Sequence, residues 1–295
     1  MRGKLKKLFA AVLAVLLALS FSGCSELTGL DAQALMSPPK TTADREAIYA
    51  LMGGGVGDVT LVYPKYGDYR SAIISRDLDG CGTSEVVSFC ANGDAGGTRL
   101  EFFKKNTDGV WSSMARFTSA ATQVDKVFFG DLTGDGMDEI IVGWGDPLTA
   151  TASVSVYYVD GDTIREFSMT TVSYSEMLLT DFDSDNINEL FVLQAAQTSG
   201  EEIMALGGLY RFDGDQPYVS KTVPLDAAVT RYTSVSFSQV NSWRRAAVLD
   251  GVKADGRMLT QVIGYDEASD RLISPLSNEE NATDRPTAAG LARCE

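Results

Sequence analysis

Two stretches of the sequence, DLTGDGMDEIIV at 131–142 and DFDSDNINELFV at 181–192, follow one pattern. Each has Asp at position 1, Asp or Thr at position 3, Asp at position 5 and Glu at position 9, and then an apolar run. Asp, Gly and Asn at the start are typical of a tight turn, and the apolar run is typical of a buried strand. The two stretches therefore predict the same loop-to-strand unit.

Two further copies lie on either side, DLDGCGTSEVVSF at 77–89 and a divergent QVNSWRRAAVLDG at 239–251, so the copies start 54, 50 and 58 residues apart. A strand pattern precedes each copy, and a strand, a polar turn and a strand follow it. Three of these turns contain Asp-Gly, the strongest short hairpin signal, at 108–109, 160–161 and 213–214. The fourth uses Asp266 and Ser269. One unit is therefore four strands.

Repeated four-stranded units predict an all-β protein, and units of this size bury both sheet faces by radial stacking in a β-propeller. A β-solenoid is the alternative, although its coils are shorter. We expect four antiparallel blades over 46–280. Residues 281–295 are either a plain tail or the start of a further repeat in a truncated chain. The one helical candidate is 42–52, with Thr42 as a possible N-cap.

The acidic loops predict Ca²⁺ sites, because alternate side chains of a tight turn converge and all the donors are hard oxygens. Position 7 would give its backbone carbonyl. The two predicted sets are Asp131, Thr133, Asp135, Met137 and Glu139, and Asp181, Asp183, Asp185, Ile187 and Glu189. The 181 set has four carboxylates and the 131 set has three, so we expect Ca²⁺ at both.

The other two loops differ in their donors. A weaker set is Asp77, Asp79, Thr83 and Glu85, because Cys81 stands at position 5 and a thiol is a poor Ca²⁺ ligand. The 239 loop has lost its acidic residues, and we expect no cation there. Turns without metal are the plain alternative, but they would not need a third carboxylate eight residues after the first. Crowded carboxylates without a counter-ion would repel by several kcal/mol as an order of magnitude.

This Asp-x-(Asp/Thr)-x-Asp core with Glu at position 9 resembles the FG-GAP repeat of the integrin α-subunit propeller and the related VCBS repeats of bacterial surface proteins. The resemblance covers about residues 55–280. It implies that the loop joins the first two strands of a blade, that its Ca²⁺ is structural, and that ligands bind the opposite face.

The N-terminus is predicted to be a lipoprotein signal peptide over 1–23, with a basic start, an apolar run and Ser22-Gly23-Cys24 resembling a bacterial lipobox. The resemblance implies cleavage before Cys24 and lipid attachment to its thiol. An ordinary signal peptide or an uncleaved anchor is the alternative. Residues 24–45 would be a tether. We therefore expect a chain anchored by lipid to the cell membrane on its extracytoplasmic face.

Composition excludes several classes of function. The chain has 25 Lys+Arg against 40 Asp+Glu, and loss of the four basic residues of the signal changes the net charge from −15 to −19. This argues against a nucleic-acid partner, which needs a basic patch. There is no His, the commonest general base and transition-metal ligand. Strand spacing keeps Cys81 and Cys90 apart, so we expect free thiols.

The sequence therefore predicts a lipid-anchored, non-enzymatic β-propeller that has structural calcium loops and binds an unknown protein or glycan. One alternative is a carboxylate-dependent carbohydrate-active enzyme, for which Asp146, Asp160 and Glu166 are candidates without a motif. The other is a structural component of the envelope. Aromatic residues such as Trp144 and Tyr157 could line a glycan surface, but their strand positions favour core packing.

Overall fold

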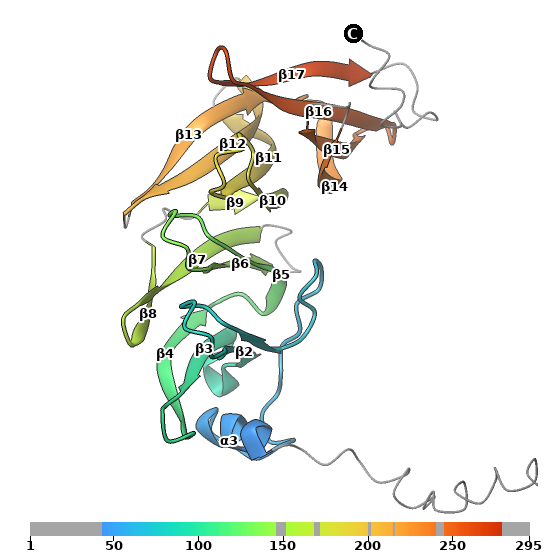
Figure 1. The fold of residues 1–295 in the computed structure, drawn as a ribbon. Helices are drawn as coiled ribbons and strands as arrows, with labels where there is room; N and C mark the ends of the chain where they lie inside the picture. The colour runs from blue at the N-terminus through green and yellow to red at the C-terminus, as the bar shows by residue number, and fades with distance from the viewer. Residues whose placement is uncertain are drawn as a thin grey trace, which may run out of the picture. The chain divides into compact units, whose positions relative to one another are not determined.

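The computed structural model describes residues 43–145, 152–167, 172–199, 202–214, 216–239 and 245–278 (Figure 1). The chain divides into two compact units, Met1–Glu46 and Ala47–Glu295. The first unit is described only at residues 43–46, where helix α3 begins. The predicted signal peptide, Cys24, residues 24–42 of the predicted tether and residues 281–295 lie outside the described residues, whereas residues 43–45 of that tether belong to α3.

The second unit is built from antiparallel sheets, which confirms the predicted all-β class. Strands follow one another in chain order within each sheet. The first sheet contains β1 (Ile73–Arg76), β2 (Glu85–Ala91), β3 (Thr98–Lys105) and β4 (Trp111–Ser119); the second contains β5 (Gln123–Gly130), β6 (Glu139–Gly145), β7 (Ala152–Asp160) and β8 (Thr163–Glu166). The third contains β10 (Glu176–Thr180), β11 (Glu189–Ser199), β12 (Glu202–Asp213) and β13 (Gln216–Pro224); the fourth contains β14 (Val229–Gln239), β15 (Arg245–Lys253), β16 (Met258–Asp266) and β17 (Arg271–Asn278).

Each acidic loop joins the first and second strands of its sheet, as its sequence position predicts. Each Asp-Gly turn joins the third and fourth strands, where local turn chemistry fixes the hairpin. One strand was not expected: β9 (Val172–Tyr174) pairs with the start of β7 and gives the second sheet a fifth strand. A short 3₁₀ turn, η2 (Gly93–Ala95), connects β2 to β3.

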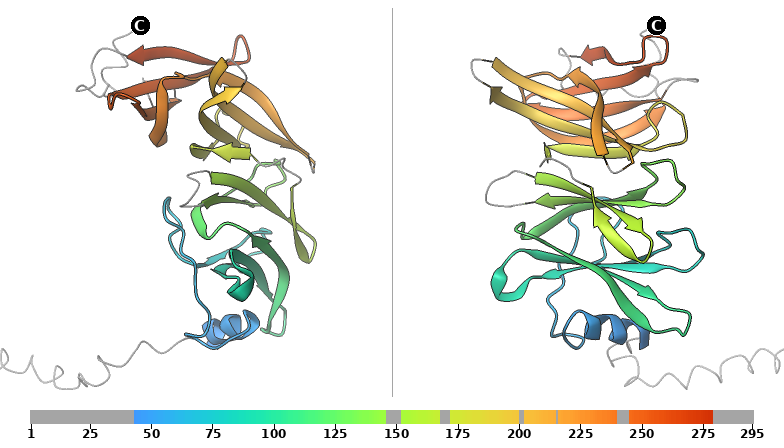
Figure 2. Two further views of the ribbon diagram at one scale, coloured as in Figure 1. Left: turned by 180° about the vertical axis from the view of Figure 1, so that it is seen from behind. Right: turned by 90° about the vertical axis from the view of Figure 1, so that its left-hand side faces the viewer.

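Consecutive sheets pack face to face, and the core lies between them (Figures 1 and 2). Central strands are therefore buried on both faces: six of the seven residues of β2, and likewise of β6, are buried. One hydrophobic cluster joins the first and second sheets, another the second and third, and another the third and fourth. In the described part of the chain, no such cluster joins the first sheet to the fourth, so the ring closure of a propeller stays a prediction.

The first and second acidic loops, and likewise the second and third, also contact each other through a backbone hydrogen bond. The Asp138 amide donates to the Leu78 carbonyl of the preceding loop at 3.2 Å, and the Asn188 amide donates to the Asp131 carbonyl at 2.8 Å. A side chain at Gly134 would lie 2.8 Å from Ile187 Cδ1, so this glycine makes room for the next loop. The loops therefore lie in register along one side of the stacked sheets.

Helix α3 (Ala43–Leu51) covers part of the first sheet. Its Ile48, with Met52 just beyond it, packs against Val86 and Phe103, which confirms the helix expected at 42–52. Cys81 and Cys90 are free, as predicted. Within the described residues, no helix is both apolar enough and long enough to span a membrane.

Candidate metal loops and a ligand pocket

All three acidic loops need left-handed backbone at positions 4 and 6. In the 131 loop Gly134 and Gly136 have φ of 82° and 83°. In the 181 loop Ser184 and Asn186 take the same places with φ of 67° and 70°. This conformation costs little for Gly and is tolerated by Asn, but it is rare for Ser. The third loop therefore keeps the same turn although its sequence lacks both glycines.

The Glu at position 9 is held in the same way in each loop. Glu85, Glu139 and Glu189 are almost completely buried, with exposed fractions of 3%, 2% and 0%. Oε2 of each accepts the backbone N–H of position 2, at 2.9 Å from Leu78, 2.7 Å from Leu132 and 2.8 Å from Phe182. A carboxylate is thus built into the base of each loop, where its charge needs a partner.

In the 131 loop, unlike the other two acidic loops, no three carboxylate or thiol groups come within 4.8 Å of one another in the described residues. Its Asp131 carboxylate accepts the amides of Gly134 and Gly136 at 2.6 and 2.8 Å and shapes the turn. Thr133 Oγ1 is buried and has no hydrogen-bond partner among the described residues. Burial, together with the charges of Asp135 and Asp131, raises the pKa of Glu139 to about 7. An oxygen without a partner and mutually repelling carboxylates are what a hard divalent ion would satisfy.

The 181 loop brings its carboxylates together but already holds a positive charge. Oxygens of Asp181, Asp183 and Glu189 lie within 4.8 Å of one another. Arg211 Nη2 lies 2.5 Å from Glu189 Oε1 and 3.2 Å from Asp185 Oδ2, and it also contacts Asp183 Oδ2. Burial works against this charge, but Glu189, Asp183 and Asp185 hold the pKa of Arg211 above its ordinary value. The donor set expected for Ca²⁺ is therefore engaged by a guanidinium.

The 77 loop brings together Asp77, Asp79 and Cys81 within 4.8 Å. Hydrogen bonding from Cys81 lowers the pKa of Asp79, and Cys81 Sγ lies 2.7 Å from Thr83 Oγ1. Position 5 thus contributes sulfur that is occupied within the loop, in keeping with a weak site. Residues 240–244 of the fourth loop lie outside the described residues, so its lack of a cation stays a prediction.

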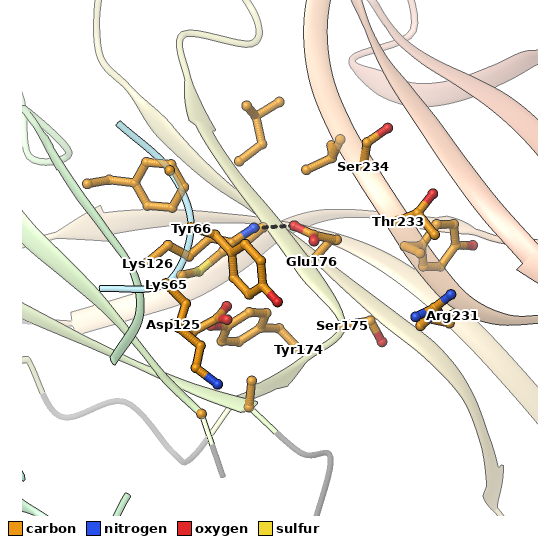
Figure 3. A pocket seen from close by; sticks show the side chains of 18 of the residues that line it. Lys65, Tyr66, Asp125, Lys126, Tyr174, Ser175, Glu176, Arg231, Thr233 and Ser234 are labelled. Carbon is orange, nitrogen blue, oxygen red and sulfur yellow. Dashed lines mark hydrogen bonds and ion pairs between the residues drawn. The ribbon is translucent and has the colours of Figure 1, made fainter. Parts of the chain in front are cut away.

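A pocket of about 860 Å³ lies on another part of the molecule, against the first strands of three sheets (Figure 3). Its walls come from the segment before β1, from β5 with the ends of β6 and β7, from β9 and β10, and from β14. Its volume is within the range of small-ligand sites. The lining residues are Lys65–Asp68, Gln123, Asp125, Lys126, Phe128, Gly145, Ala152, Tyr174–Leu178 and Thr230–Val235.

Two polar contacts fix the pocket floor. Lys126 forms an ion pair with Glu176, and both side chains are mostly buried. The Tyr174 hydroxyl donates to Asp125 Oδ2 at 2.6 Å, and burial, together with the Asp125 charge, raises the pKa of this tyrosine. The Asp125 carbonyl also accepts the Tyr66 amide at 2.8 Å, which holds the segment before β1 against β5. The floor is therefore a rigid polar surface.

The pocket rim carries groups that are open to solvent. Tyr66 is 57% exposed, and Lys65, Asp68 and Arg231 are also exposed. Figure 3 shows Lys65 and Tyr66 on one side of the pocket and Arg231 on the other. Sequence reasoning missed this site, because its segments lie up to about 170 residues apart and only the stacking of first strands joins them.

Two catalytic candidates of the enzyme alternative, Asp160 and Glu166, do not line this pocket. Asp160 forms an ion pair with Arg165 at 2.5 Å, and Glu166 lies on β8 opposite Tyr157. Asp146 lies outside the described residues. Trp144 and Tyr157 are buried in the core between the first two sheets, which confirms core packing for both. Comparison with protein-family models and with curated proteins finds no match to the chain.

Proposed function

We propose that this chain is a non-enzymatic binding module that takes a polar extracytoplasmic ligand, a glycan or a segment of protein, in the pocket of 860 Å³. The observation that carries the proposal is the combination of a fixed polar floor with an exposed aromatic ring and exposed charges at the rim. Aromatic faces with a few placed polar groups are how such sites bind and orient ligands.

The setting that we propose follows the sequence. The sheets would belong to a β-propeller similar to FG-GAP and VCBS repeats, anchored on the outer side of the membrane by lipid on Cys24. Ca²⁺ would be structural and would be held by Asp131, Thr133, Asp135, the Met137 carbonyl and Glu139. This ion would neutralise the buried carboxylate and fix the loop, so its contribution would be to stability and not to chemistry.

A carboxylate-dependent carbohydrate-active enzyme is the second candidate, because Asp125 and Glu176 both line the pocket. Both carboxylates are engaged, one by Tyr174 and the other by Lys126. Binding without turnover is therefore the better-supported function.

The test is a binding screen with the mature chain against neutral glycans, acidic glycans and peptides, followed by calorimetry on any ligand found. Tyr66→Ala and Arg231→Ala should each weaken binding at least tenfold. Tyr218→Ala is the matched control, since Tyr218 is 47% exposed on β13 and does not line the pocket. Equal binding by all variants would place the ligand elsewhere, and cleavage of a bound glycan would favour the enzyme.

A further inference from the structure

In the first three sheets, the third strand has one residue at an equivalent position near the point where the acidic loop enters the second strand. The residue after position 9 pairs with Phe103 in the first sheet, Tyr157 in the second and Tyr210 in the third. The next residue along the third strand is therefore equivalent in these three sheets. These equivalent residues are Lys104, Tyr158 and Arg211.

Arg211 is the member of this set that enters the loop. One nitrogen, Nη2, reaches positions 3, 5 and 9 of the 181 loop, at 3.2 Å from Asp185, 2.5 Å from Glu189 and in direct contact with Asp183. The Asp183 and Glu189 side chains are 11% and 0% exposed, and that of Arg211 is 26% exposed. A charge buried in this way is stable only with its partner, so the guanidinium neutralises the loop from within.

In the second sheet, the residue at this position is the uncharged Tyr158. Its ring packs on Phe167 with centroids 4.4 Å apart, and it brings no positive charge to the 131 loop. Among the described residues, the 131 loop forms an ion pair through Asp138, whose Oδ2 lies 2.5 Å from Arg76 Nε. Asp138 is at position 8, outside the predicted donor set. The two loops thus share their turn and their buried Glu but differ in the third-strand residue.

We propose that Arg211 is a resident counter-cation that makes the 181 loop independent of metal, and that the residue at this third-strand position decides whether a loop takes a guanidinium or a divalent cation. The comparison with the 131 loop rests on the proposed function, in which that loop holds Ca²⁺. The assignment to Arg211 itself does not, because its contacts are within the 181 loop.

The test exchanges the two residues and counts bound Ca²⁺ by equilibrium dialysis, with thermal melts in Ca²⁺ and in EDTA. Arg211→Tyr should raise the Ca²⁺ count by one per chain, lower the melting temperature in EDTA and recover it in Ca²⁺. Arg211→Lys keeps the charge and should leave the count unchanged. The reciprocal Tyr158→Arg should lower the count by one.

The outcomes of these measurements either support or contradict the proposed role of Arg211. A wild-type count of zero that becomes one in Arg211→Tyr would remove calcium from the 131 loop but support the role of Arg211. An equal count in wild type and Arg211→Tyr would overturn the inference. Arg211→Tyr protein that stays unfolded in saturating Ca²⁺ would also overturn it, because a metal ion could then not replace the guanidinium. Arg257→Tyr, at an exposed hairpin position, controls for the loss of an arginine.

Discussion

Arg76, at the end of the first strand of the first sheet, forms an ion pair with Asp138 in the acidic loop of the second sheet, with 2.5 Å between Nε and Oδ2. Arg76 also donates to the Tyr69 hydroxyl at 2.7 Å and stacks over the Phe129 ring. The acidic loops are therefore part of the contact between sheets. We expect the conformation of a loop to affect how the neighbouring sheets stack.

The first prediction concerns this ion pair. Arg76→Ala and Asp138→Ala should each lower the free energy of unfolding, and a double-mutant cycle should give a coupling of about 1 kcal/mol, since both side chains are partly buried. The measurement is urea unfolding of the four proteins. The exposed pair of Arg257 and Asp255 is the control, and its coupling should be near zero. A zero coupling at Arg76 and Asp138 would show that the sheets stack without this pair.

The second prediction separates the two acidic loops. With a dissociation constant in the range of extracellular calcium modules, about 10⁻⁴–10⁻³ M, 10 mM Ca²⁺ should stabilise the protein by roughly 1.5–3 kcal/mol. Asp135→Asn should remove that response, because it takes a carboxylate from the loop that lacks an internal cation. Asp185→Asn should leave it intact, because Arg211 already serves that loop. Melting curves with Ca²⁺ and EDTA measure both, with Asp213→Asn as an exposed control. If Asp185→Asn abolished the response to Ca²⁺ and Asp135→Asn preserved it, the ion would have to be assigned to the 181 loop instead of the 131 loop.

The third prediction concerns pH in the absence of metal. The pKa of Glu139 is about 7 in the folded chain, whereas the ordinary value is 4.5. The folded state therefore favours the protonated carboxyl group. The free energy of unfolding should therefore fall as pH rises from about 4.5 to 7, by an amount on the order of 3 kcal/mol. Urea unfolding in EDTA at pH 5 and pH 7.5 measures the loss. Glu139→Gln should remove only its own share of the loss, because burial also raises the pKa of Glu189 to about 7 and raises that of Glu85. A wild-type protein equally stable at both values would contradict the burial argument.

Much of the fold could be predicted from the sequence because its determinants are local. The apolar run after Glu139 and the Asp160-Gly161 turn specify a strand and a hairpin through neighbours within ten residues or so, and the structure confirms both. Strand β9 escaped prediction because it is short and its pairing with β7 is set by tertiary contact.

The candidate sites were less visible because they depend on register between distant strands. Arg211 reaches the 181 loop through the pairing of β11 with β12, and no residue near Asp183 in the sequence predicts this contact. One signal was present: Arg211 and Tyr158 both stand two residues before an Asp-Gly turn, so aligning the hairpins would have paired them. The sequence has no comparable signal for the pocket, because only the stacking of the sheets places Tyr66 and Arg231 in the lining of one pocket.

The fourth prediction concerns the N-terminus. If Cys24 carries the lipid, Cys24→Ala should move the protein from the membrane fraction to the soluble fraction of cells that express the full chain. Cys81→Ala is the matched control, since Cys81 is an exposed free thiol and should not affect anchoring. Immunoblots of the two fractions measure the change. Cys24→Ala protein that stays with the membrane would favour an uncleaved anchor.

The last prediction concerns the pocket floor, where Gly143 on β6 leaves room for Tyr174. A Cβ at Gly143 would lie 2.2 Å from the Tyr174 hydroxyl oxygen and 2.7 Å from Met177 Cε. Gly143→Ala should therefore displace Tyr174 from Asp125 and destabilise the chain by about 1–3 kcal/mol, the usual cost of overpacking. Gly145→Ala, two residues further along the same strand, is the control, because its nearest neighbours would be at an ordinary 3.7 Å.

Tyr174→Phe distinguishes a steric effect from a loss of polar contact. It removes the hydroxyl that clashes with the new methyl group, so the double variant Gly143→Ala/Tyr174→Phe should cost less than the sum of the two single changes. Met177 and the remaining ring atom at 3.1 Å keep the rescue partial. Urea unfolding and ligand binding should be measured on all three proteins. Strictly additive costs would mean that Gly143 and Tyr174 do not share this space, and the pocket floor would then depend on other contacts.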